Sequence, residues 1–471
     1  MLDSYLPMGE IFGTDGIRDR AGHGFLAPDK VTQVARATGA LLRRSPAKLK
    51  TAVPKAFHHL GGKPLKHAPG RGRVIIGRDT RASGPEIEDA LAKGFQSMGI
   101  DVGLAGVIST PGVATLTRLW GGALGVVISA SHNPADDNGI KLISPQGFKI
   151  PDGAEDSIEK LLKGRPLAGR VKKPTPAVDL SHQTTDYPDF LATFCRPLKD
   201  MTIAIDCGHG AASAFAGPLF RRLGAKVIVL NASPNGTNIN AGSGALHPEQ
   251  VAAAVKRERA DVGVAFDGDA DRAILVDETG EIRDGETVLA LCGLHLKEQK
   301  RLPQNTVVST VMANFGLERH LASKGISLKR TKVGDKFVAE EMLKSGAALG
   351  GEPSGHVLFF DAAPAGDGML TALRVFDVLA ERGQRLSQAA FPKFPQVLIN
   401  VKVARKPPLE NVSGIQSAIG AAEMELGADG RILVRYSGTE HLCRVMVEGP
   451  RDEMVNRLAA SVADVVKKEL A

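Results

Sequence analysis

Short apolar runs that end in polar, glycine-bearing loops recur along this chain and constrain its fold more than any other feature. The runs are rich in Val, Ile and Ala and alternate with stretches of helical periodicity, a pattern typical of buried strands in α/β layers. They cover residues 74–76, 124–128, 203–205, 262–266 and 307–308. Because open α/β sheets bind ligands at the carboxyl ends of their strands, chemistry is expected in the loops that follow. These loops are residues 77–81, 129–133, 206–210 and 267–272.

The length of 471 residues is about three times that of a typical domain of roughly 150 residues, so several domains are expected. Proline-rich residues 172–176 and the stretch around Pro392 and Pro395 suit linkers. The last piece is expected to be a small α+β domain, with strands at 397–403 and 432–435 and helices from Ser413 and Asp452. The predicted domains are 1–180, 181–277, 278–395 and 396–471.

The net charge of +7 comes from one segment of the chain. Residues 43–73 contain nine Lys or Arg and no Asp or Glu, and removing these nine leaves 50 basic residues against 52 acidic ones. Several prolines and glycines in the segment break helices, so we interpret it as a mobile, solvated insertion without a dedicated partner. A basic run can also attract phosphates or nucleic acid, and a nucleic-acid-binding protein is therefore the non-enzymatic alternative.

The four cysteines are far apart and form no CxxC pair, which argues against a disulfide framework and a structural zinc site. The first ten residues lack the basic start and apolar stretch of a signal peptide, and no window of about 20 residues is continuously apolar. We therefore expect a cytoplasmic protein that does not enter a membrane.

The first chemical motif is a turn after the strand at 125–128, and residues 129–134 of this turn are Ser-Ala-Ser-His-Asn-Pro. A serine there could act as a nucleophile, although the surroundings are not the G-x-S-x-G elbow of esterases. The alternative is that the Ser, His and Asn side chains only hydrogen-bond the turn.

The second motif places Asp267, Asp269 and Asp271 directly after the strand at 262–266. Three alternating carboxylates repel one another unless a cation lies between them, and hard oxygen ligands favour Mg²⁺. An EF-hand is not expected, because the sixth loop position is Arg272 instead of glycine and residues 273–276 resemble a strand. The open coordination of such an ion suits a phosphoserine oxygen, which connects this motif to the serine turn.

Two further segments suit anionic or hydroxylated ligands. Residues 435–440, followed by Arg444, combine an arginine fork with Ser, Gly and Thr and predict a second phosphate site, with a plain hairpin turn as the alternative. Residues 350–356 place Glu352, Ser354 and His356 on a turn that suits sugar hydroxyls, although a purely structural turn is equally compatible.

Together these motifs resemble the α-D-phosphohexomutases, and within that superfamily the chain is most similar to bacterial phosphoglucosamine mutases. The matching segments run in family order across nearly the whole chain apart from the basic segment. They are residues 12–18, 128–134, 137–141, 267–272, 331–335, 351–356, 435–440 and 444–449.

The resemblance implies four domains around a central cleft. The first three domains share an α/β topology with mixed sheets, and the C-terminal domain is a smaller α+β unit. It also implies roles for individual residues. Ser131 carries the phosphate and binds one Mg²⁺ together with Asp267, Asp269 and Asp271. Arg18, Lys141, Arg272 and His356 are the further catalytic positions. The expected substrate-binding residues are Gly334, Asp335, Glu352, Ser354, Arg435, Ser437, Gly438, Thr439 and Arg444.

The implied activity interconverts glucosamine 6-phosphate and glucosamine 1-phosphate through a phosphoserine and a sugar 1,6-bisphosphate, and it supplies UDP-N-acetylglucosamine and cell-wall precursors. The expected partner is a small phosphosugar, with no nucleic acid and no membrane, and a homodimer is an open option. Phosphomannomutase or phosphoglucomutase activity is the alternative, because Pro353 stands where aminosugar mutases more often have a polar residue. A phosphatase that uses Asp267 or Asp269 as its nucleophile is an alternative from another class.

Overall fold

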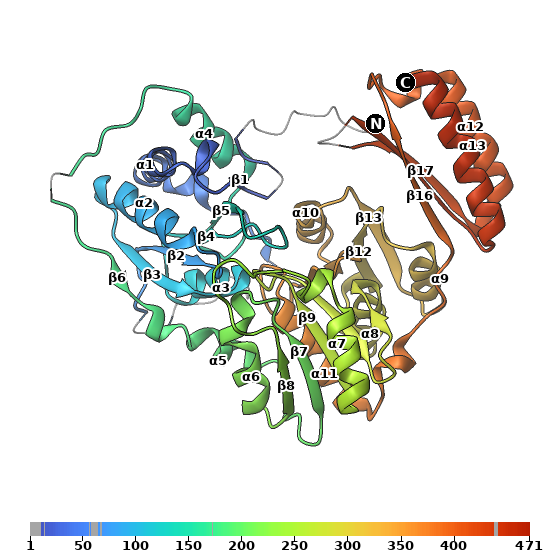
Figure 1. Cartoon of the computed structure of the whole chain (residues 1–471), viewed down its shortest axis with the longest axis horizontal. Helices are drawn as coiled ribbons and strands as arrows, with labels where there is room; N and C mark the ends of the chain where they lie inside the picture. Colours follow the sequence, from blue (N-terminus) through green and yellow to red (C-terminus); the bar gives the residue numbers. More distant parts are fainter. Residues whose placement is uncertain are drawn as a thin grey trace. The chain divides into compact units, whose positions relative to one another are not determined.

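The computed structural model describes residues 11–13, 15–55, 57, 65, 68–171, 173–437 and 441–471. The chain divides into two compact units. The first runs up to Val311 and includes Leu328–Ala390, and the second consists of Met312–Ser327 and Phe391–Ala471. Figure 1 shows the chain coloured along its sequence.

The first unit begins with a six-stranded mixed sheet in the order β1-β5-β4-β2-β3-β6. The central strand β2 is parallel to β3 and β4, whereas β5 is antiparallel to both β4 and β1. The strands are β1 Ile17–Arg20, β2 Val74–Arg78, β3 Val102–Val107, β4 Leu124–Ile128, β5 Asp137–Ile143 and β6 Val178–Asp179. The helices are α1 Pro28–Arg44, α2 Gly84–Ser97, α3 Thr110–Leu119 and α4 Asp152–Leu162.

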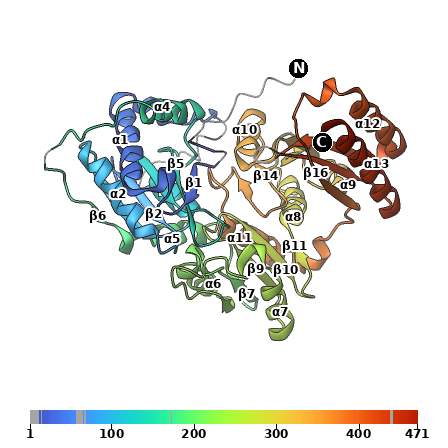
Figure 2. The same ribbon diagram turned by 45° about the horizontal axis from the view of Figure 1, so that its top comes forward.

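The two faces of this sheet are covered by different helices. Alternate residues of β2, β4 and β5 pack with α1, α2 and α4 in one buried core, and α1 and α2 lie side by side in Figures 1 and 2. On β2, Val74 and Ile76 belong to this core, while Gly77 lies against Val113 of α3. Since both faces are covered, the central strands are apolar on both sides, which explains the continuous apolar runs in the sequence.

The second sheet has the order β11-β10-β9-β7-β8, with parallel pairing around β7 and antiparallel pairing of β9, β10 and β11. Helix α7 packs on one face through Val251 and Val255 (Figure 2). The strands are β7 Thr202–Asp206, β8 Lys226–Leu230, β9 Val262–Phe266, β10 Ala273–Asp277 and β11 Ile282–Arg283. The helices are α5 Asp186–Ala192, α6 Ala216–Arg222 and α7 Glu249–Glu258.

The third sheet has the order β13-β12-β14-β15, in which β12 and β14 are parallel and β14 and β15 antiparallel. Its strands are β12 Thr306–Thr310, β13 Ser327–Thr331, β14 Leu349–Gly351 and β15 Val357–Phe359. The helices of this part are α8 Gly285–Glu298, α10 Asp335–Ser345 and α11 Gly368–Arg382.

The second unit contains an antiparallel sheet in the order β16-β18-β17, packed against two helices. Its elements are α9 Phe315–Ser323, β16 Gln396–Lys402, α12 Ser413–Leu426, β17 Arg431–Tyr436, β18 Leu442–Glu448 and α13 Asp452–Leu470. The predicted fold class is confirmed: three α/β parts with mixed sheets precede a smaller α+β part. Within the described part of the chain, every helix is too short or too polar to span a bilayer.

The interpretation of residues 43–73 as a solvated insertion is wrong for its described first half. After α1, Leu49 is fully buried, and Phe57 is only 4% exposed. The Phe57 ring meets Phe360 edge-on at 5.4 Å between centroids, in a cluster that includes Phe148 and Met342. Charge and proline content masked these two apolar anchors. The positions from 58 to 64, together with 66 and 67, lie outside the described residues.

Candidate active site

Ser131 lies in the turn after β4 and is almost fully buried. Its backbone has a φ of 53°, in the left-handed region, which costs a residue other than glycine roughly 1–2 kcal/mol. The backbone N–H donates to Ser129 Oγ at 2.9 Å, and Ser131 Oγ donates to Asp267 Oδ2 at 2.7 Å. The serine hydroxyl is therefore aimed at the acidic loop between β9 and β10.

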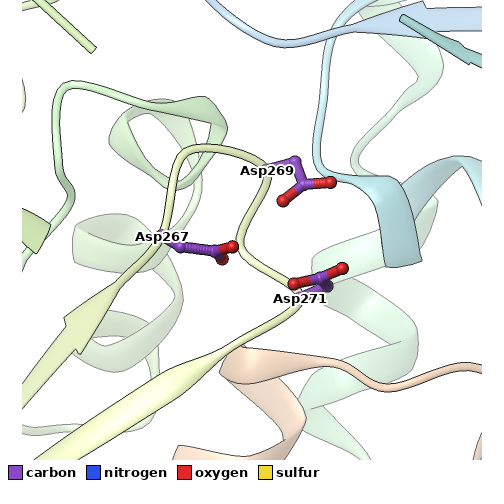
Figure 3. A group of neighbouring side chains, drawn as sticks. All are labelled: Asp267, Asp269 and Asp271. Atoms are coloured by element: carbon purple, nitrogen blue, oxygen red, sulfur yellow. The ribbon is translucent and has the colours of Figure 1, made fainter. Parts of the chain in front are cut away.

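The acidic loop gathers Asp267, Asp269 and Asp271 at one point (Figure 3). The three residues are buried, and each offers a carboxylate oxygen within 4.8 Å of the others. Among the described residues, Asp269 Oδ1 has no hydrogen-bond partner. Burial, with repulsion from Asp271 and Asp269, raises the pKa of Asp267 well above its usual value. Such a set of hard, mutually repelling oxygens fits a divalent cation.

Lys141 on β5 is the cation nearest to this loop. Its Nζ lies 2.9 Å from Asp269 Oδ2, 3.0 Å from Asp15 Oδ2 and 3.8 Å from Asp271 Oδ2. Burial alone would lower the pKa of Lys141, but Asp15, Asp269 and Asp271 together raise it above its usual value. Lys141 is therefore a fixed positive charge. Thr110 Oγ1 also donates to Asp269 Oδ2, at 2.5 Å.

Lys149 links Asp15, near the start of the described chain, to Asp335 at the start of helix α10. Arg18 Nη2 lies 2.6 Å from Asp15 Oδ2, and Lys149 Nζ contacts Asp15 and, at 2.6 Å, Asp335 Oδ2. Burial would raise the pKa of Asp15, but Lys141, Lys149 and Arg18 outweigh burial and hold it well below its usual value. Both Asp15 and Asp335 are therefore ionised at neutral pH.

His356 and Arg272 face each other across an antiparallel bridge between the second and third sheets. His356 Nδ1 lies 3.6 Å from Asp271 Oδ1, and its Nε2 lies 3.6 Å from Asp335 Oδ2. Burial alone would lower the pKa of His356, but Asp271, Asp335 and Glu352 raise it to about 9. The imidazole is therefore protonated at neutral pH and can donate to an anion.

The turn between β14 and β15 carries Glu352, whose Oε1 accepts a hydrogen bond from the Gly334 N–H at 3.0 Å. Glu352 is buried, whereas Ser354 is exposed at the tip of the same turn. Gly355 adopts a φ of 90° and donates its N–H to the Glu352 carbonyl at 3.1 Å. Glycine is required at position 355, since the Cβ of any other residue would lie 2.4 Å from the Ala273 carbonyl oxygen.

In the second unit, Arg435 of β17 and Arg444 of β18 are directly paired across the sheet and so share one face. Ser437 is buried, and its N–H donates to the Leu442 carbonyl at 2.8 Å. Gly438 and Thr439, which are also predicted to bind phosphate, lie outside the described residues.

The structure gathers most of the residues predicted for the site in the first unit. They are Arg18, Ser131, Lys141, Asp267, Asp269, Asp271, Arg272, Gly334, Asp335, Glu352 and His356. Sequence reasoning assigned no role to Asp15, Lys149 or Thr110. Asp15 lies within the matching segment 12–18. No sequence pattern indicates Lys149 or Thr110, because only the folded chain brings them close to the carboxylates.

Comparison with known proteins agrees with this architecture. Models of the phosphoglucomutase/phosphomannomutase family match residues 47–167 (α/β/α domain I), 185–280 (α/β/α domain II), 284–396 (α/β/α domain III) and 398–465 (C-terminal domain). The first range includes most of the basic segment. The predicted boundary near 180 falls between the first two ranges, and those near 277 and 395 lie within a few residues of the next junctions. These boundaries stay predictions.

Curated relatives match over nearly the full length. The phosphoglucosamine mutase of Symbiobacterium thermophilum is 46% identical, with 98% of this chain and 100% of the relative covered. That of Geobacillus thermodenitrificans is 44% identical, with 98% and 99% covered.

Two solved structures share the fold. A phosphoglucomutase/phosphomannomutase family protein from Burkholderia thailandensis has a TM-score of 0.77 at 25% identity, with 98% of this chain and 97% of that chain covered. The Aspergillus fumigatus N-acetylphosphoglucosamine mutase, in complex with GlcNAc-6P and magnesium, has a TM-score of 0.65 at 18% identity, with 99% and 97% covered.

The four matched domains and the serine turn aimed at an acidic loop define the class of the protein as a phosphohexomutase, an enzyme of the isomerase class. At 46% identity over 98% of its length, the chain belongs to the phosphoglucosamine mutase family.

Proposed function

We propose that this enzyme interconverts glucosamine 6-phosphate and glucosamine 1-phosphate, with Ser131 as the phosphate carrier. The observation that carries the proposal is the 2.7 Å hydrogen bond from Ser131 Oγ to Asp267 Oδ2, inside a cluster of buried carboxylates. The names of the curated relatives support the amino sugar as substrate and do not favour the phosphomannomutase or phosphoglucomutase alternative.

The buried carboxylates fit Mg²⁺, since they offer hard oxygens close together and Asp269 Oδ1 has no hydrogen-bond partner among the described residues. Asp267, Asp269 and Asp271 would hold the ion together with the phosphate of Ser131. When bound, Mg²⁺ withdraws negative charge from the phosphoryl group and so makes the phosphorus more electrophilic.

In the forward reaction, the phosphorus–oxygen bond to Ser131 breaks, a new one forms to the free hydroxyl oxygen of the sugar monophosphate, and the hydroxyl proton ends on Ser131 Oγ. The product is a sugar 1,6-bisphosphate, which then returns its other phosphate to Ser131. Lys141, Arg18, Arg272 and His356 would offset the negative charge on the moving phosphoryl group. Exclusion of water protects the phosphoserine from hydrolysis.

Glu352, Ser354, Gly334 and Asp335 are proposed to bind the sugar hydroxyls. Arg435, Ser437, Gly438, Thr439 and Arg444 are proposed to bind the phosphate that does not react. The small phosphosugar is thus the proposed partner, and the cytoplasmic location and the homodimer stay predictions.

The substrate assignment is tested by assaying the purified enzyme on glucosamine, glucose and mannose 6-phosphates. The highest catalytic efficiency is expected on glucosamine 6-phosphate. A higher catalytic efficiency on glucose or mannose 6-phosphate would show that the amino sugar is not the natural substrate. The proposed mutase chemistry would not be affected by that result.

A further inference from the structure

The loop at 77–81, which the sequence marked as a place for chemistry, carries none of the proposed catalytic groups. It lies directly beneath the serine turn instead. Asp79 and Arg81 form a fully buried ion pair, with Arg81 Nε 2.9 Å from Asp79 Oδ2. A buried ion pair is costly unless further hydrogen bonds satisfy both partners, so the remaining contacts of this pair indicate its purpose.

Those contacts go to the serine turn. Arg81 Nη2 donates to the carbonyl oxygens of Ser131 and Asn133, both at 2.9 Å, and Nη1 donates to that of Asp137 at 3.0 Å. Asp79 Oδ2 accepts from Ser129 Oγ at 2.6 Å, and Ser129 Oγ in turn accepts from the Ser131 N–H. The ion pair therefore fixes both backbone groups of Ser131: Arg81 binds its carbonyl directly, and Asp79 holds its N–H through Ser129.

A third contact comes from the second sheet's part of the chain. Asn240 Nδ2 donates to the Ser131 carbonyl at 2.9 Å and to the Asn133 carbonyl at 3.1 Å. Asn240 is itself buried, and its backbone N–H donates to the Gly208 carbonyl at 2.8 Å. Beside it, Gly268 of the acidic loop lies so close that a Cβ would be 2.6 Å from the Ser131 carbonyl oxygen. The serine turn, Asn240 and the acidic loop thus meet at one carbonyl.

We propose that Asp79, Arg81 and Asn240 are positioning residues that hold Ser131 in its left-handed conformation, and that Asn240 fixes the serine turn to the acidic loop. The inference rests on the proposed role of Ser131 as phosphate carrier. In a variant without the Asn240 side chain, Arg81 still donates a hydrogen bond to the Ser131 carbonyl. We therefore expect such a variant to fold, but with Ser131 Oγ less precisely oriented toward the acidic loop. Phosphoryl transfer depends on that aim, because an error of about 1 Å can cost about 100-fold in rate.

Asn240→Gly tests the proposal, with Asn231→Gly as its matched control. Both asparagines belong to the same part of the chain and have positive φ values, 59° and 48°, which glycine adopts without strain. Each donates two hydrogen bonds through Nδ2, but Asn231 donates to Asp206 and Gln250, away from the serine turn. The full-length variants are assayed with Mg²⁺ and glucosamine 1-phosphate, well below the lower of their melting temperatures.

We expect Asn240→Gly to lower kcat by about 10- to 100-fold with KM changed by less than about two-fold, and Asn231→Gly to leave both nearly unchanged. Single-turnover transfer from the phosphorylated enzyme should slow by the same factor as kcat. A shifted ³¹P resonance of the phosphoserine in Asn240→Gly alone would report the changed aim directly, which a merely structural residue would not cause.

If Asn240→Gly folds poorly, Asn240→Asp is used in its place. This variant keeps the shape of the side chain but removes the Nδ2 donors, and it should show the same loss of kcat. Equal kcat values in the Asn240 and Asn231 variants would overturn the proposal. Its failure is distinguishable from that of the proposed function: an active Ser131→Ala variant refutes the carrier, whereas an inactive Ser131→Ala beside a fully active Asn240→Gly refutes only the positioning role.

Discussion

Ser131 Oγ donates a hydrogen bond to Asp267 Oδ2 across 2.7 Å, although 136 residues separate them in the chain. The bond joins the end of β4 in the first sheet to the end of β9 in the second. The bond holds the Ser131 hydroxyl beside the carboxylate cluster, so that a phosphate on Ser131 and the carboxylates would bind the same cation.

Asp269→Asn is expected to weaken Mg²⁺ binding by at least about 10-fold, because it removes one ligand charge from the cluster. Turnover at limiting Mg²⁺ should fall in proportion. Titration calorimetry with MgCl₂ measures the affinity, and Asp261→Asn, an exposed aspartate of the same domain, is the control. Activity that is indifferent to a chelator would contradict a metal-dependent mechanism.

Phe57→Ala is expected to destabilise the protein by about 3 kcal/mol, since it opens a cavity among Phe148, Met342 and Phe360. Replacing residues 45–57 by a Gly/Ser linker should cost at least as much. The charge pattern alone would predict no effect from such a replacement, because loop length affects closure entropy only weakly. Urea unfolding measures the difference, and the exposed Lys55→Ala should change stability by less than about 0.5 kcal/mol.

This segment shows where prediction from the sequence ends. The three aspartates were predictable because their chemistry is local, alternating carboxylates after a strand, whereas Ser131 was singled out by the resemblance to the phosphohexomutases. Phe360 and Met342, which pack in the same cluster as Phe57, lie about 300 residues further along the chain in the third sheet's part, and nothing near residue 57 indicates them. The same holds for Lys149 and Asn240, which stand in no motif and reach the site only through the packing of one α/β part on another.

Lys149→Met is expected to lower stability by about 2 kcal/mol at neutral pH, because it leaves Asp15 and Asp335 without their shared cation. The pKa values of both carboxyls are lowered, so their contribution is present above the unfolded-state pKa of about 4 and is lost as pH falls through the folded-state pKa. The difference between wild type and variant should therefore persist from pH 5 to 8, at roughly constant size, and shrink at strongly acidic pH.

Thermal unfolding across this pH range measures the effect of Lys149. Lys93→Met removes a lysine from an exposed pair with Asp89 and should have little effect at any pH. A Lys149 variant as stable as the Lys93 variant would show that the bridge between Asp15 and Asp335 is dispensable.

Arg435→Ala is expected to weaken the binding of both glucosamine 1-phosphate and glucosamine 6-phosphate by roughly 10- to 150-fold, since each would place its non-reacting phosphate on the same loop. Calorimetry on the dephosphorylated enzyme measures both affinities, and Arg405→Ala serves as a control on an exposed arginine of the same unit. If only one of the two ligands were weakened, a single shared phosphate site and the reorientation of the bisphosphate would both be refuted.

The most direct test of the whole account is to locate the covalent phosphate and follow it. The enzyme is labelled with a radioactive sugar 1,6-bisphosphate, mapped by phosphopeptide analysis, and then mixed with unlabelled glucosamine 6-phosphate. We expect label on Ser131 that moves to the sugar within a turnover, and no turnover in Ser131→Ala. Label on Asp267 or Asp269, released as inorganic phosphate, would contradict it and identify a phosphatase instead.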